Sequence, residues 1–338
     1  MGKKILFIGG SVNQTSMMHQ ISLKMEDCDS YFSPYYGDGY IDFFAKRGVL
    51  DFSILGGEFK KSTENYLNSN NLKIDYQGKE NNYDLVFTGS DLIIPKNILD
   101  KRIILVQEGM TDPENFMFHL VKHLGLPRWM ASTSVTGLSD LYDILCVASE
   151  GYKELFIRKG VKPEKIVVTG IPNFDNLKTY LNNNFPMKNF VLVATSDSRE
   201  TFKYENRKKF ILDCVKIANG KQLIFKLHPN ENFKKATKEI NKYAPDALVY
   251  TSGDINEMIA NCDILITKYS SVSYVGISLG KVVHSYFDIE ELKRLTPIQN
   301  NGTSAERIAK IALHLLEHPK SYPININEFQ NLSETVNV

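Results

Sequence analysis

The stretch Ile5-Leu6-Phe7-Ile8-Gly9-Gly10-Ser11 sets the pattern from which the fold is predicted. An apolar run of strand length ends in a glycine turn, and a helical pattern follows over residues 11–24. The same order of short apolar strand and amphipathic helix repeats along the chain. This alternation is typical of βαβ units and predicts an α/β fold with mainly parallel sheets.

Two series of strands follow one another along the sequence. Strands of the first series are expected at residues 5–8, 84–87, 102–106, 144–148 and 165–169. Strands of the second are expected at residues 190–195, 222–227, 247–250, 263–267 and 282–285. Between the series, an Asn cluster and a Pro at residues 180–186 favour a linker. We therefore expect two Rossmann-like domains facing across a cleft.

The expected domain limits follow from this linker. They are an N-terminal domain at 1–179, a linker at 180–188 and a C-terminal domain at 189–338, whose last helix is a candidate to pack back on the first domain. The length of 338 residues agrees with two domains of ordinary size, and 43% hydrophobic with 23% charged residues is typical of a globular protein.

Charge and cysteine usage exclude several classes of function. With 40 basic and 39 acidic residues interspersed, the net charge is +1, so no nucleic-acid partner is expected. The cysteines lack CxxC spacing and are expected to be buried thiols (Cys28, Cys146, Cys214, Cys262). No run of 18 apolar residues occurs. We expect a cytoplasmic protein, at most peripherally attached to a membrane at its inner face, and leave homodimer formation open.

Polar segments at strand ends are the candidate ligand sites, because ligands of open parallel sheets bind at the carboxyl ends of strands. Helices are expected after Gly9-Gly10-Ser11 and after Tyr269-Ser270-Ser271, where free N–H groups favour phosphates. A plain tight turn explains Gly9-Gly10 equally well, since the full G-x-G-x-x-G spacing is absent.

Glu108 and His228 are the candidate catalytic residues on these grounds. Glu108 follows the apolar run at 103–106, where partial desolvation suits a general base, or it caps the next helix. His228 follows the run at 223–225, and Pro229 fixes the turn that presents it. A histidine there can bind phosphate or move a proton, although a single histidine is more often structural.

Three further segments are candidates for binding a phosphorylated donor. Lys226 precedes His228, and the hydroxyls of Ser270 and Ser271 are expected both to cap a helix and to face the ligand. Ser196 and Arg199 follow the run at 190–194 and could hold a diphosphate, or form a solvated loop. No cluster of His, Cys and carboxylates with metal-ligand spacing was recognised, and neither was a P-loop or a nucleophile elbow, so no metal or cofactor is expected.

The chain resembles the GT-B superfamily, which includes the UDP-N-acetylglucosamine 2-epimerases. Gly160-Val161-Lys162-Pro163-Glu164-Lys165-Ile166 followed by Thr169-Gly170-Ile171-Pro172-Asn173 looks like the epimerases' "GV-P-I-TGN" segment. Glu108-Gly109 resembles their "EAG", and Arg199-Glu200 fits the end of "HRREN". By the same resemblance Asp91 stands where the epimerases have "GD", which makes it a third catalytic candidate.

Other epimerase positions are altered. Asp197 replaces the histidine of "HRREN", Gly10-Ser11 stands in place of "GTRPE", and Tyr274 and Val275 replace the two glutamates of "SGGxQEE". A second group of relatives fits these positions better. Lys226-Leu227-His228-Pro229 and Tyr269-Ser270-Ser271-Val272 are similar to the "KxHP" and "YSSV" motifs of CDP-glycerol glycerophosphotransferases and to the HP and Ser-Ser motifs of bacterial sialyltransferases.

The resemblance implies a metal-independent transferase that moves a sugar or polyol phosphate from a nucleotide-activated, cytidine-type donor to a glycan or lipid-linked acceptor of surface polysaccharide synthesis. His228, Ser270 and Ser271 would contact the donor, and Glu108 would deprotonate the acceptor. The alternatives are a 2-epimerase with altered acid–base residues and a non-catalytic nucleotide-sugar-binding protein.

Overall fold

A computed structural model describes residues 2–196, 199 and 205–335 of the chain. The chain forms two compact units: Met1–Asp175 together with Pro297–Val338, and Asn176–Thr296. The second unit thus begins ahead of the linker expected at 180–188. Residues 297–335, and not only the last helix, pack with the first unit.

The first unit is built on a six-stranded sheet in the order β2-β1-β3-β4-β5-β6, in which every neighbouring pair is parallel. The strands are β1 (Lys3–Gly9), β2 (Cys28–Pro34), β3 (Leu85–Thr88), β4 (Arg102–Val106), β5 (Ile144–Val147) and β6 (Ile166–Val168). All residues of β3, β4, β5 and β6 are buried, as expected of parallel strands covered on both faces.

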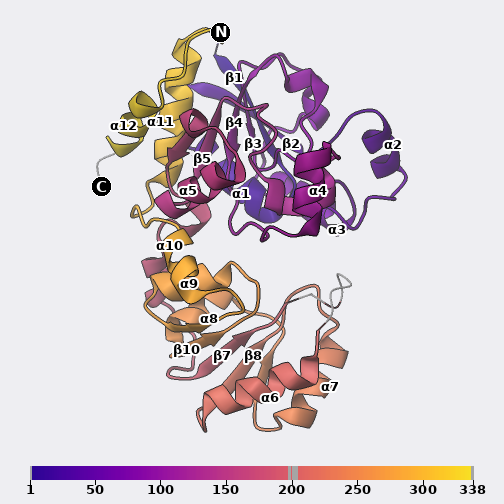
Figure 1. Ribbon diagram of the computed structural model, residues 1–338, viewed down its shortest axis with the longest axis vertical. Helices are drawn as coiled ribbons and strands as arrows, with labels where there is room; N and C mark the ends of the chain where they lie inside the picture. The colour runs from indigo at the N-terminus through magenta and orange to yellow at the C-terminus, as the bar shows by residue number, and fades with distance from the viewer. Residues whose placement is uncertain (1, 197–198, 200–204, 336–338) are drawn as a thin grey trace. The chain divides into compact units, whose positions relative to one another are not determined.

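The helices of this unit are α1 (Val12–Ser22), α2 (Tyr40–Lys46), α3 (Gly57–Ser69), α4 (Phe116–Leu124), α5 (Glu150–Lys159), α11 (Ser304–Glu317) and α12 (Ile326–Glu334). They flank the sheet, except α2, which buries none of its residues and stands away from the sheet (Figure 1). The two C-terminal helices return to this unit, where α11 contacts α1 and α12 contacts β6. The Gln330 amide accepts from Val168 N at 3.0 Å and donates to Val168 O at 3.3 Å, which pairs the edge strand β6 with α12.

The second unit holds a five-stranded parallel sheet in the order β11-β10-β7-β8-β9. Its strands are β7 (Val191–Ala194), β8 (Leu223–Lys226), β9 (Leu248–Tyr250), β10 (Ile264–Ile266) and β11 (Val282–His284). Its helices are α6 (Arg207–Ala218), α7 (Phe233–Tyr243), α8 (Ile255–Asn261), α9 (Val272–Ser278) and α10 (Ile289–Leu295). Phe210 and Ile240, from α6 and α7, pack with Val193 and Phe225 of the sheet.

The predicted fold class, two parallel-sheet α/β domains, is confirmed, while the cleft between the domains stays a prediction.

Local signals define the helix ends: Ser149 Oγ accepts from Tyr152 N at 3.3 Å at the start of α5, and Gly160 ends it with a φ of 112°. Cys146, Cys214 and Cys262 are buried, as predicted, and burial raises the pKa of each to about 12. The prediction is wrong for Cys28, which is only half-buried at the start of the edge strand β2. None of the helices in the described part of the chain has the length and apolar character needed to cross a bilayer.

Candidate functional site

The first unit brings Glu108 together with the loop after β1. Glu108 follows β4, Ser11 follows β1, and β3 lies between these strands. Ser11 Oγ donates to Glu108 Oε1 at 2.8 Å, and Gln14 Nε2 donates to Glu108 Oε2 at 2.7 Å. Both oxygens of this half-buried carboxylate are therefore oriented. A carboxylate has about four acceptor positions, so it can also accept the proton of a substrate hydroxyl.

Gln14 links this carboxylate to the start of α1. Ser11 Oγ accepts from Gln14 N at 3.1 Å, and Gln14 Oε1 accepts from Gly10 N at 2.8 Å. Gln14 was not singled out from the sequence, although Ser11-Val12-Asn13-Gln14 has the S-x-x-Q spacing of a capping box. This capping signal could have identified Gln14 at the helix start, but only the structure adds its bond to Glu108.

Close packing explains the two glycines of this loop. A Cβ atom at Gly9 would lie 2.6 Å from Thr15 Oγ1, and one at Gly10 would lie 2.8 Å from Ile54. Glycine is thus required where β1 turns into α1, whether or not a ligand binds there. The tight-turn interpretation has a direct structural basis, and the assignment of Gly9, Gly10 and Ser11 to acceptor binding stays a prediction.

Asp91 lies after β3 in a fully buried position with a relative exposure of 0%. Its carboxylate accepts from Gly137 N at 3.0 and 3.1 Å and from Ser139 N at 3.0 Å. Burial raises the pKa of Asp91, and the hydrogen bonds from Gly137 and Ser139 oppose that shift. These contacts fasten the loop at 137–139 to the sheet. They support a structural role for Asp91, and its catalytic role stays a prediction.

The second unit brings three of the predicted segments to one edge of its sheet. Strands β8 and β10 both pair in parallel with β7, with Lys226 opposite Ala194 and Ile266 opposite Val193. The loops that follow these strands therefore leave the sheet at the same edge. Neighbouring strands lie about 4.8 Å apart, so the loops after β8 and β10 begin about 10 Å from each other.

The His228 loop is held by its own backbone. His228 N donates to Glu231 Oε2 at 2.9 Å and to Thr195 Oγ1 at 3.1 Å. Asn230 N donates to His228 Nδ1 at 3.3 Å, so the neutral ring carries its proton on Nε2. His228 is half-buried and Pro229 is exposed. The arrangement gives a fixed loop whose imidazole can donate from Nε2 to an anionic ligand.

A buried network of alternating charges supports these loops. The Glu231 side chain is 0% exposed and contacts both Thr195 Oγ1 and Arg207. Arg207 pairs with Glu205 at 3.1 Å, and Lys268 Nζ reaches the same carboxylate at 3.1 Å. The network connects the segments after β7, β8 and β10. The sequence does not reveal it, because its members are far apart in the chain and have no motif spacing.

Arg199 is engaged by a neighbouring helix. Its Nη1 lies 3.0 and 2.8 Å from the two carboxylate oxygens of Glu239 on α7. Ser196 is half-buried at the end of β7, while Asp197 and Glu200 lie outside the described residues. The ion pair with Glu239 gives Arg199 a structural contact, and its role in holding a diphosphate stays a prediction.

Lys226 ends β8 in a buried position. Its Nζ donates to Leu227 O at 3.3 Å, and burial lowers its pKa. The lysine therefore lies at the sheet edge next to the His228 loop. Tyr269, after β10, is 59% exposed and packs edge-on against Tyr286 and Phe287, with ring centroids 5.6 and 4.9 Å away. Its exposed ring is open to contact with a ligand.

The expected side-chain cap at Ser271 is wrong. Ser271 occupies the N-cap position of α9, but its φ of −63° and ψ of −15° are helical and its side chain makes no cap hydrogen bond. An N-cap serine ordinarily has extended backbone, which lets its oxygen reach the N–H groups of the first turn. Ser270 Oγ only approaches Val272 N, at 3.5 Å. Neither hydroxyl makes a strong cap hydrogen bond, so both can bind a ligand.

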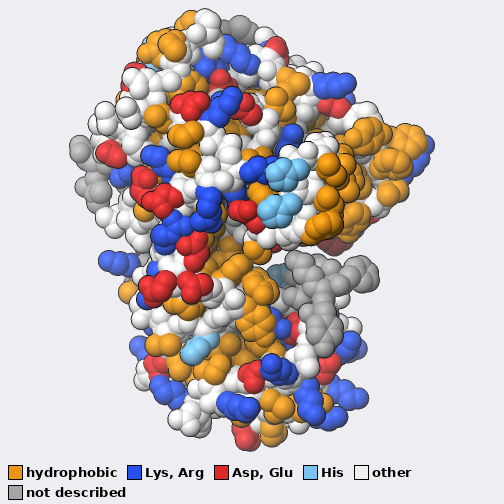
Figure 2. All heavy atoms as spheres, in the orientation of Figure 1, with side chains coloured by type: hydrophobic (Ala, Val, Ile, Leu, Met, Phe, Trp, Pro, Cys, Tyr) orange, Lys and Arg blue, Asp and Glu red, His pale blue; other side chains and the backbone are white. Residues whose placement is uncertain are grey.

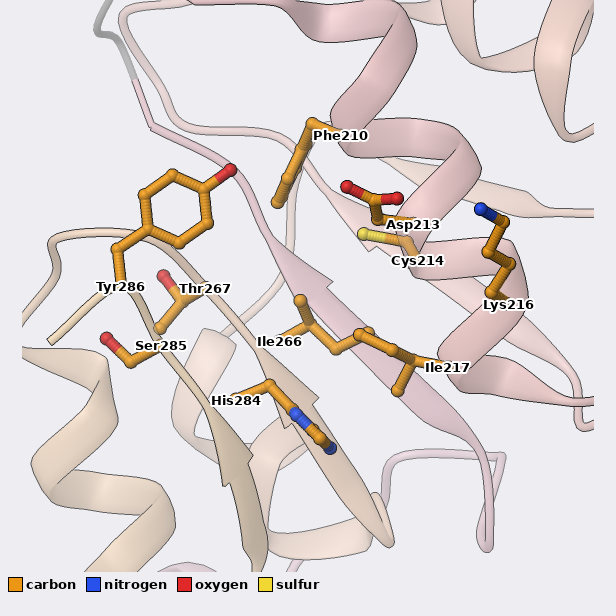
Figure 3. A pocket seen from close by; sticks show the side chains of 10 residues that line it. All are labelled: Phe210, Asp213, Cys214, Lys216, Ile217, Ile266, Thr267, His284, Ser285 and Tyr286. Carbon is orange, nitrogen blue, oxygen red and sulfur yellow. The ribbon is translucent and has the colours of Figure 1, made fainter. Parts of the chain in front are cut away.

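A pocket of about 420 Å³ lies between α6 and the strands β10 and β11 (Figure 3). It is lined by α6, β10 and the residues after β11, including Phe210, Thr267 and Tyr286. Thr267 Oγ1 is buried and has no hydrogen-bond partner among the described residues. Lys268 Nζ lies 4.4 Å from the Phe210 ring centroid and connects this pocket to the charge network. His228, Ser270 and Ser271 do not line it.

The positions that the epimerase resemblance assigns to two glutamates are interior positions. Tyr274 is 0% exposed and Val275 is 3% exposed, both within α9. These side chains therefore belong to the core of the second unit and present no carboxylate at the sheet edge. The geometry disfavours the acid–base arrangement that the epimerases would need here.

Comparison with known families agrees with the phosphotransferase motifs. Residues 120–281 match the family model described as CDP-Glycerol:Poly(glycerophosphate) glycerophosphotransferase. This segment includes Lys226-Leu227-His228-Pro229 and Tyr269-Ser270-Ser271-Val272. The resemblance predicted from these motifs is confirmed. No curated protein sequence matches the chain.

Solved structures with a similar fold include several nucleotide-sugar enzymes. MnaA of S. aureus, determined with UDP, has a TM-score of 0.60 at 13% identity, with 96% of this chain and 100% of that chain covered. The Neisseria meningitidis UDP-GlcNAc 2-epimerase bound to UDP-GlcNAc has a TM-score of 0.53 at 13% identity, with 98% of each chain covered. The Methanocaldococcus jannaschii UDP-GlcNAc 2-epimerase, in complex with UDP-GlcNAc and UDP, has a TM-score of 0.51 at 14% identity, also with 98% of each chain covered. At these identities the likeness shows the fold alone.

Proposed function

We propose that this protein transfers a polyol phosphate, of the glycerol phosphate type, from a cytidine-diphosphate-activated donor to a hydroxyl of a surface-glycan acceptor. One observation carries the proposal. The two segments that resemble phosphotransferase motifs lie within the matched residues 120–281 and leave the sheet at one edge, on either side of β7. Two segments about 40 residues apart in sequence thus bring hydrogen-bonding side chains to the same edge of the second sheet.

The donor's phosphates are assigned to this edge of the second unit. His228 Nε2 and the hydroxyls of Ser270 and Ser271 are hydrogen-bond donors there, and Lys226 adds a positive charge near the start of the His228 loop. Charge-assisted hydrogen bonds to phosphate are stronger than neutral ones. Donors fixed in place before reaction stabilise the negative charge that develops on the leaving nucleotide.

Glu108 is assigned to the acceptor. The acceptor oxygen attacks the phosphorus that bears the polyol, and the bond from this phosphorus to the bridging oxygen breaks. The nucleotide leaves as the monophosphate with the electron pair of that bond, and the hydroxyl proton passes to Glu108. Ser11 and Gln14 orient both carboxylate oxygens for this task. Transfer of a sugar would place the attack at carbon instead, with the same assignment of Glu108.

The experiment that tests this function supplies purified protein with CDP-glycerol and an acceptor that carries a glycerol phosphate primer. We expect CMP release that depends on both donor and acceptor, together with lengthening of the acceptor. CDP-ribitol, CMP-sialic acid and UDP-N-acetylglucosamine serve as competing donors. Donor binding without nucleotide release from any donor would instead identify a non-catalytic nucleotide-binding protein.

The second candidate is a UDP-N-acetylglucosamine 2-epimerase, which the fold of the solved relatives favours. The test is incubation with UDP-N-acetylglucosamine alone. An epimerase forms the manno epimer without an acceptor, whereas the proposed transferase leaves this compound unchanged. Because Tyr274 and Val275 are buried in α9, we expect no epimer.

An exposed aromatic surface favours a lipid-linked acceptor held at a membrane. We define the α2 surface by Tyr40, Phe43, Phe44 and Phe52, which are 64%, 48%, 42% and 80% exposed. Figure 2 shows hydrophobic side chains gathered on the part of this face where Figure 1 places α2 and α4. The Arg47 guanidinium lies 3.4 Å from the Phe43 ring centroid, which adds positive charge to this aromatic surface.

Aromatic side chains beside a cation suit the headgroup region of an anionic membrane. We expect the protein to sediment with phosphatidylglycerol vesicles and a Phe44→Ser/Phe52→Ser variant to remain in the supernatant. Phe233→Ser, which changes an exposed phenylalanine at the start of α7, is the control. Equal sedimentation of all three proteins would reject the assignment of the α2 surface.

A further inference from the structure

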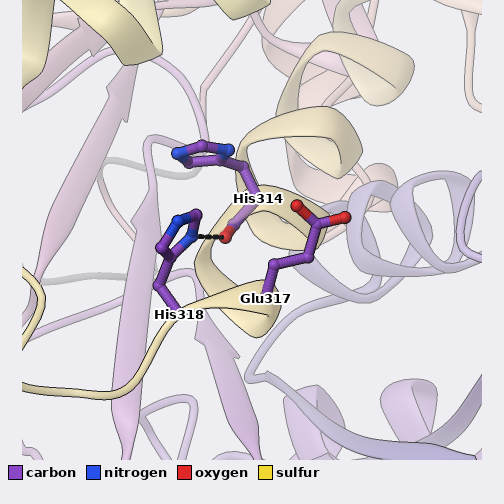
Figure 4. A group of neighbouring side chains, drawn as sticks. All are labelled: His314, Glu317 and His318. Atoms are coloured by element: carbon purple, nitrogen blue, oxygen red, sulfur yellow. Dashed lines mark hydrogen bonds between the residues drawn. The ribbon is translucent and has the colours of Figure 1, made fainter.

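The end of α11 gathers several side chains of metal-ligating types. His314, Glu317 and His318 each offer one ligand atom, and these atoms lie within 4.8 Å of one another (Figure 4). Glu328, on α12, brings Oε1 to 3.0 Å from His314 Nε2. In His314-Leu315-Leu316-Glu317-His318 the two histidines are four residues apart, with His314 in the last turn of α11 and His318 at its C-cap, where the backbone is already extended.

Hydrogen bonding prepares His318 as a ligand. His318 Nδ1 lies 2.9 Å from the carbonyl oxygen of His314 (Figure 4), and a carbonyl oxygen only accepts, so Nδ1 carries the proton. The lone pair of the neutral ring is then on Nε2. A hydrogen bond from the second ring nitrogen to a backbone carbonyl is the arrangement that orients metal-ligating histidines in proteins. Contact of the His318 ring with the tilted ring of Tyr322, with centroids 4.0 Å apart, also restricts its orientation.

His314 offers a nitrogen without a hydrogen-bond partner. Its Nε2 is buried and, despite its 3.0 Å separation from Glu328 Oε1, makes no hydrogen bond of acceptable geometry within the described residues. Two ligands about 2.0–2.1 Å from a tetrahedral zinc ion lie about 3.3–3.4 Å apart. The nitrogen and the carboxylate oxygen therefore have close to the separation of two ligands that share one ion.

We propose that His314, His318, Glu317 and Glu328 bind one divalent transition-metal ion, of which zinc is the form to test. Imidazole nitrogen together with carboxylate oxygen suits zinc among the common ions. Because Glu328 belongs to α12 and the histidines lie at the end of α11, the ion joins the two C-terminal helices of the first unit. The site is separate from the sheet edges assigned to donor and acceptor, and its role is structural.

A second histidine pair supplies a matched control. His119 and His123 have the same spacing on α4, with ring centroids 6.3 Å apart, but both are exposed. Among the described residues, only the α11 group brings three ligand side chains together. Chance chelation by neighbouring histidines would affect both pairs alike, whereas a built site would depend on His314 and His318.

The test measures zinc affinity of the tag-free full chain by competition with a chromogenic chelator after metal removal. We expect one zinc ion per chain. Binding should be weaker by about 10- to 100-fold or more in His314→Ala/His318→Ala, since loss of a residue that only hydrogen-bonds a metal ligand already costs that much. His119→Ala/His123→Ala should bind as the unaltered protein does. Equal weakening in both double variants, or no zinc bound by the unaltered chain, would overturn the proposal.

A milder variant separates ligand loss from misfolding. Glu328→Gln keeps the side-chain shape and both histidines. We expect zinc to slow hydrogen exchange of the amides at 326–334 in the unaltered chain and to have a smaller effect in Glu328→Gln, with equal exchange of the two proteins before zinc is added. Identical protection of α12 by zinc in both proteins would reject the joining of the two helices.

Discussion

Ser11 Oγ donates a hydrogen bond of 2.8 Å to Oε1 of Glu108 across a sequence separation of 97 residues. The hydroxyl that caps α1 and the carboxylate that follows β4 therefore belong to one arrangement at the carboxyl edge of the first sheet. Together with Gln14 it fixes the direction of the carboxylate. A fixed base is expected to contribute more to proton removal than a mobile one, because its geometry does not have to be found during the reaction.

Replacing Glu108 by Gln tests the acceptor base. The amide retains the size of the side chain but does not accept the hydroxyl proton, so we expect turnover to fall by about 10²-fold or more. The dissociation constant of the donor should stay within about twofold, which isothermal titration with the intact donor measures. Turnover equal to that of the unaltered protein would remove Glu108 from the reaction.

Replacing His228 by Ala tests the donor edge of the second unit. Loss of a hydrogen bond to a charged phosphate costs about 1.5–3 kcal/mol, so donor affinity should fall by about 10- to 100-fold. His284→Ala is the matched control, because His284 is exposed at the end of β11, which β10 and β7 separate from β8 in the same sheet. If both variants bind the donor as the unaltered protein does, the His228 loop is not the donor site.

Asp91 separates a structural carboxylate from a catalytic one. In Asp91→Asn one oxygen is replaced by an NH₂ group, which faces the N–H groups of Gly137 or Ser139 instead of accepting from them. We expect the free energy of unfolding to fall by about 1–3 kcal/mol while turnover per folded molecule is retained. Urea denaturation and active-site titration measure the two quantities. A stable variant without turnover would restore Asp91 as a catalytic candidate.

Lys159 predicts how stability depends on pH. Burial lowers the pKa of this lysine from 10.5 to about 8, and its Nζ donates to Ser134 O at 2.9 Å. Between these pH values the unfolded chain binds more protons at this residue than the folded chain does. The contribution of Lys159 to the free energy of unfolding therefore rises with pH from about 8 to 10.5.

Lys159→Met removes this titration. Each pKa unit corresponds to about 1.4 kcal/mol. The free energy of unfolding of the variant, relative to that of the unaltered protein, should therefore fall by about 2–3 kcal/mol between pH 7 and pH 10. Comparing the two proteins at each pH cancels the titration of the buried thiols and tyrosines that both contain. A stability difference that does not change with pH would contradict the lowered pKa.

The sequence predicts the central strands well because their burial makes them continuous apolar runs. It does not predict β2, the edge strand at Cys28–Pro34, since its first four residues are only half-buried and include Asp29 and Ser30. A polar edge strand lacks the apolar run by which the other strands are recognised. The return of α11 and α12 to the first unit likewise depends on contacts such as Gln330 with Val168 that leave no local pattern.

The candidate site shows the same division. Strand order brings His228 and Ser270 to one edge, which alternation of strands and helices in the sequence can anticipate. The ion pairs around this edge, in contrast, depend on tertiary contacts: Arg199 pairs with Glu239 on α7, and Glu231 pairs with Arg207 on α6. Nothing in the local sequence selects them. Ser271 fails as a cap because its backbone is helical, which residue type alone does not determine.

The most direct test of the proposed function is the release of CMP from CDP-glycerol by the purified protein, measured with and without a glycerol phosphate-primed acceptor. We predict release that requires the acceptor and that falls by about 10²-fold in Glu108→Gln. Acceptor lengthening should match the CMP released. No release from CDP-glycerol or any other cytidine-activated donor, with UDP-N-acetylglucosamine converted to its manno epimer instead, would contradict the account.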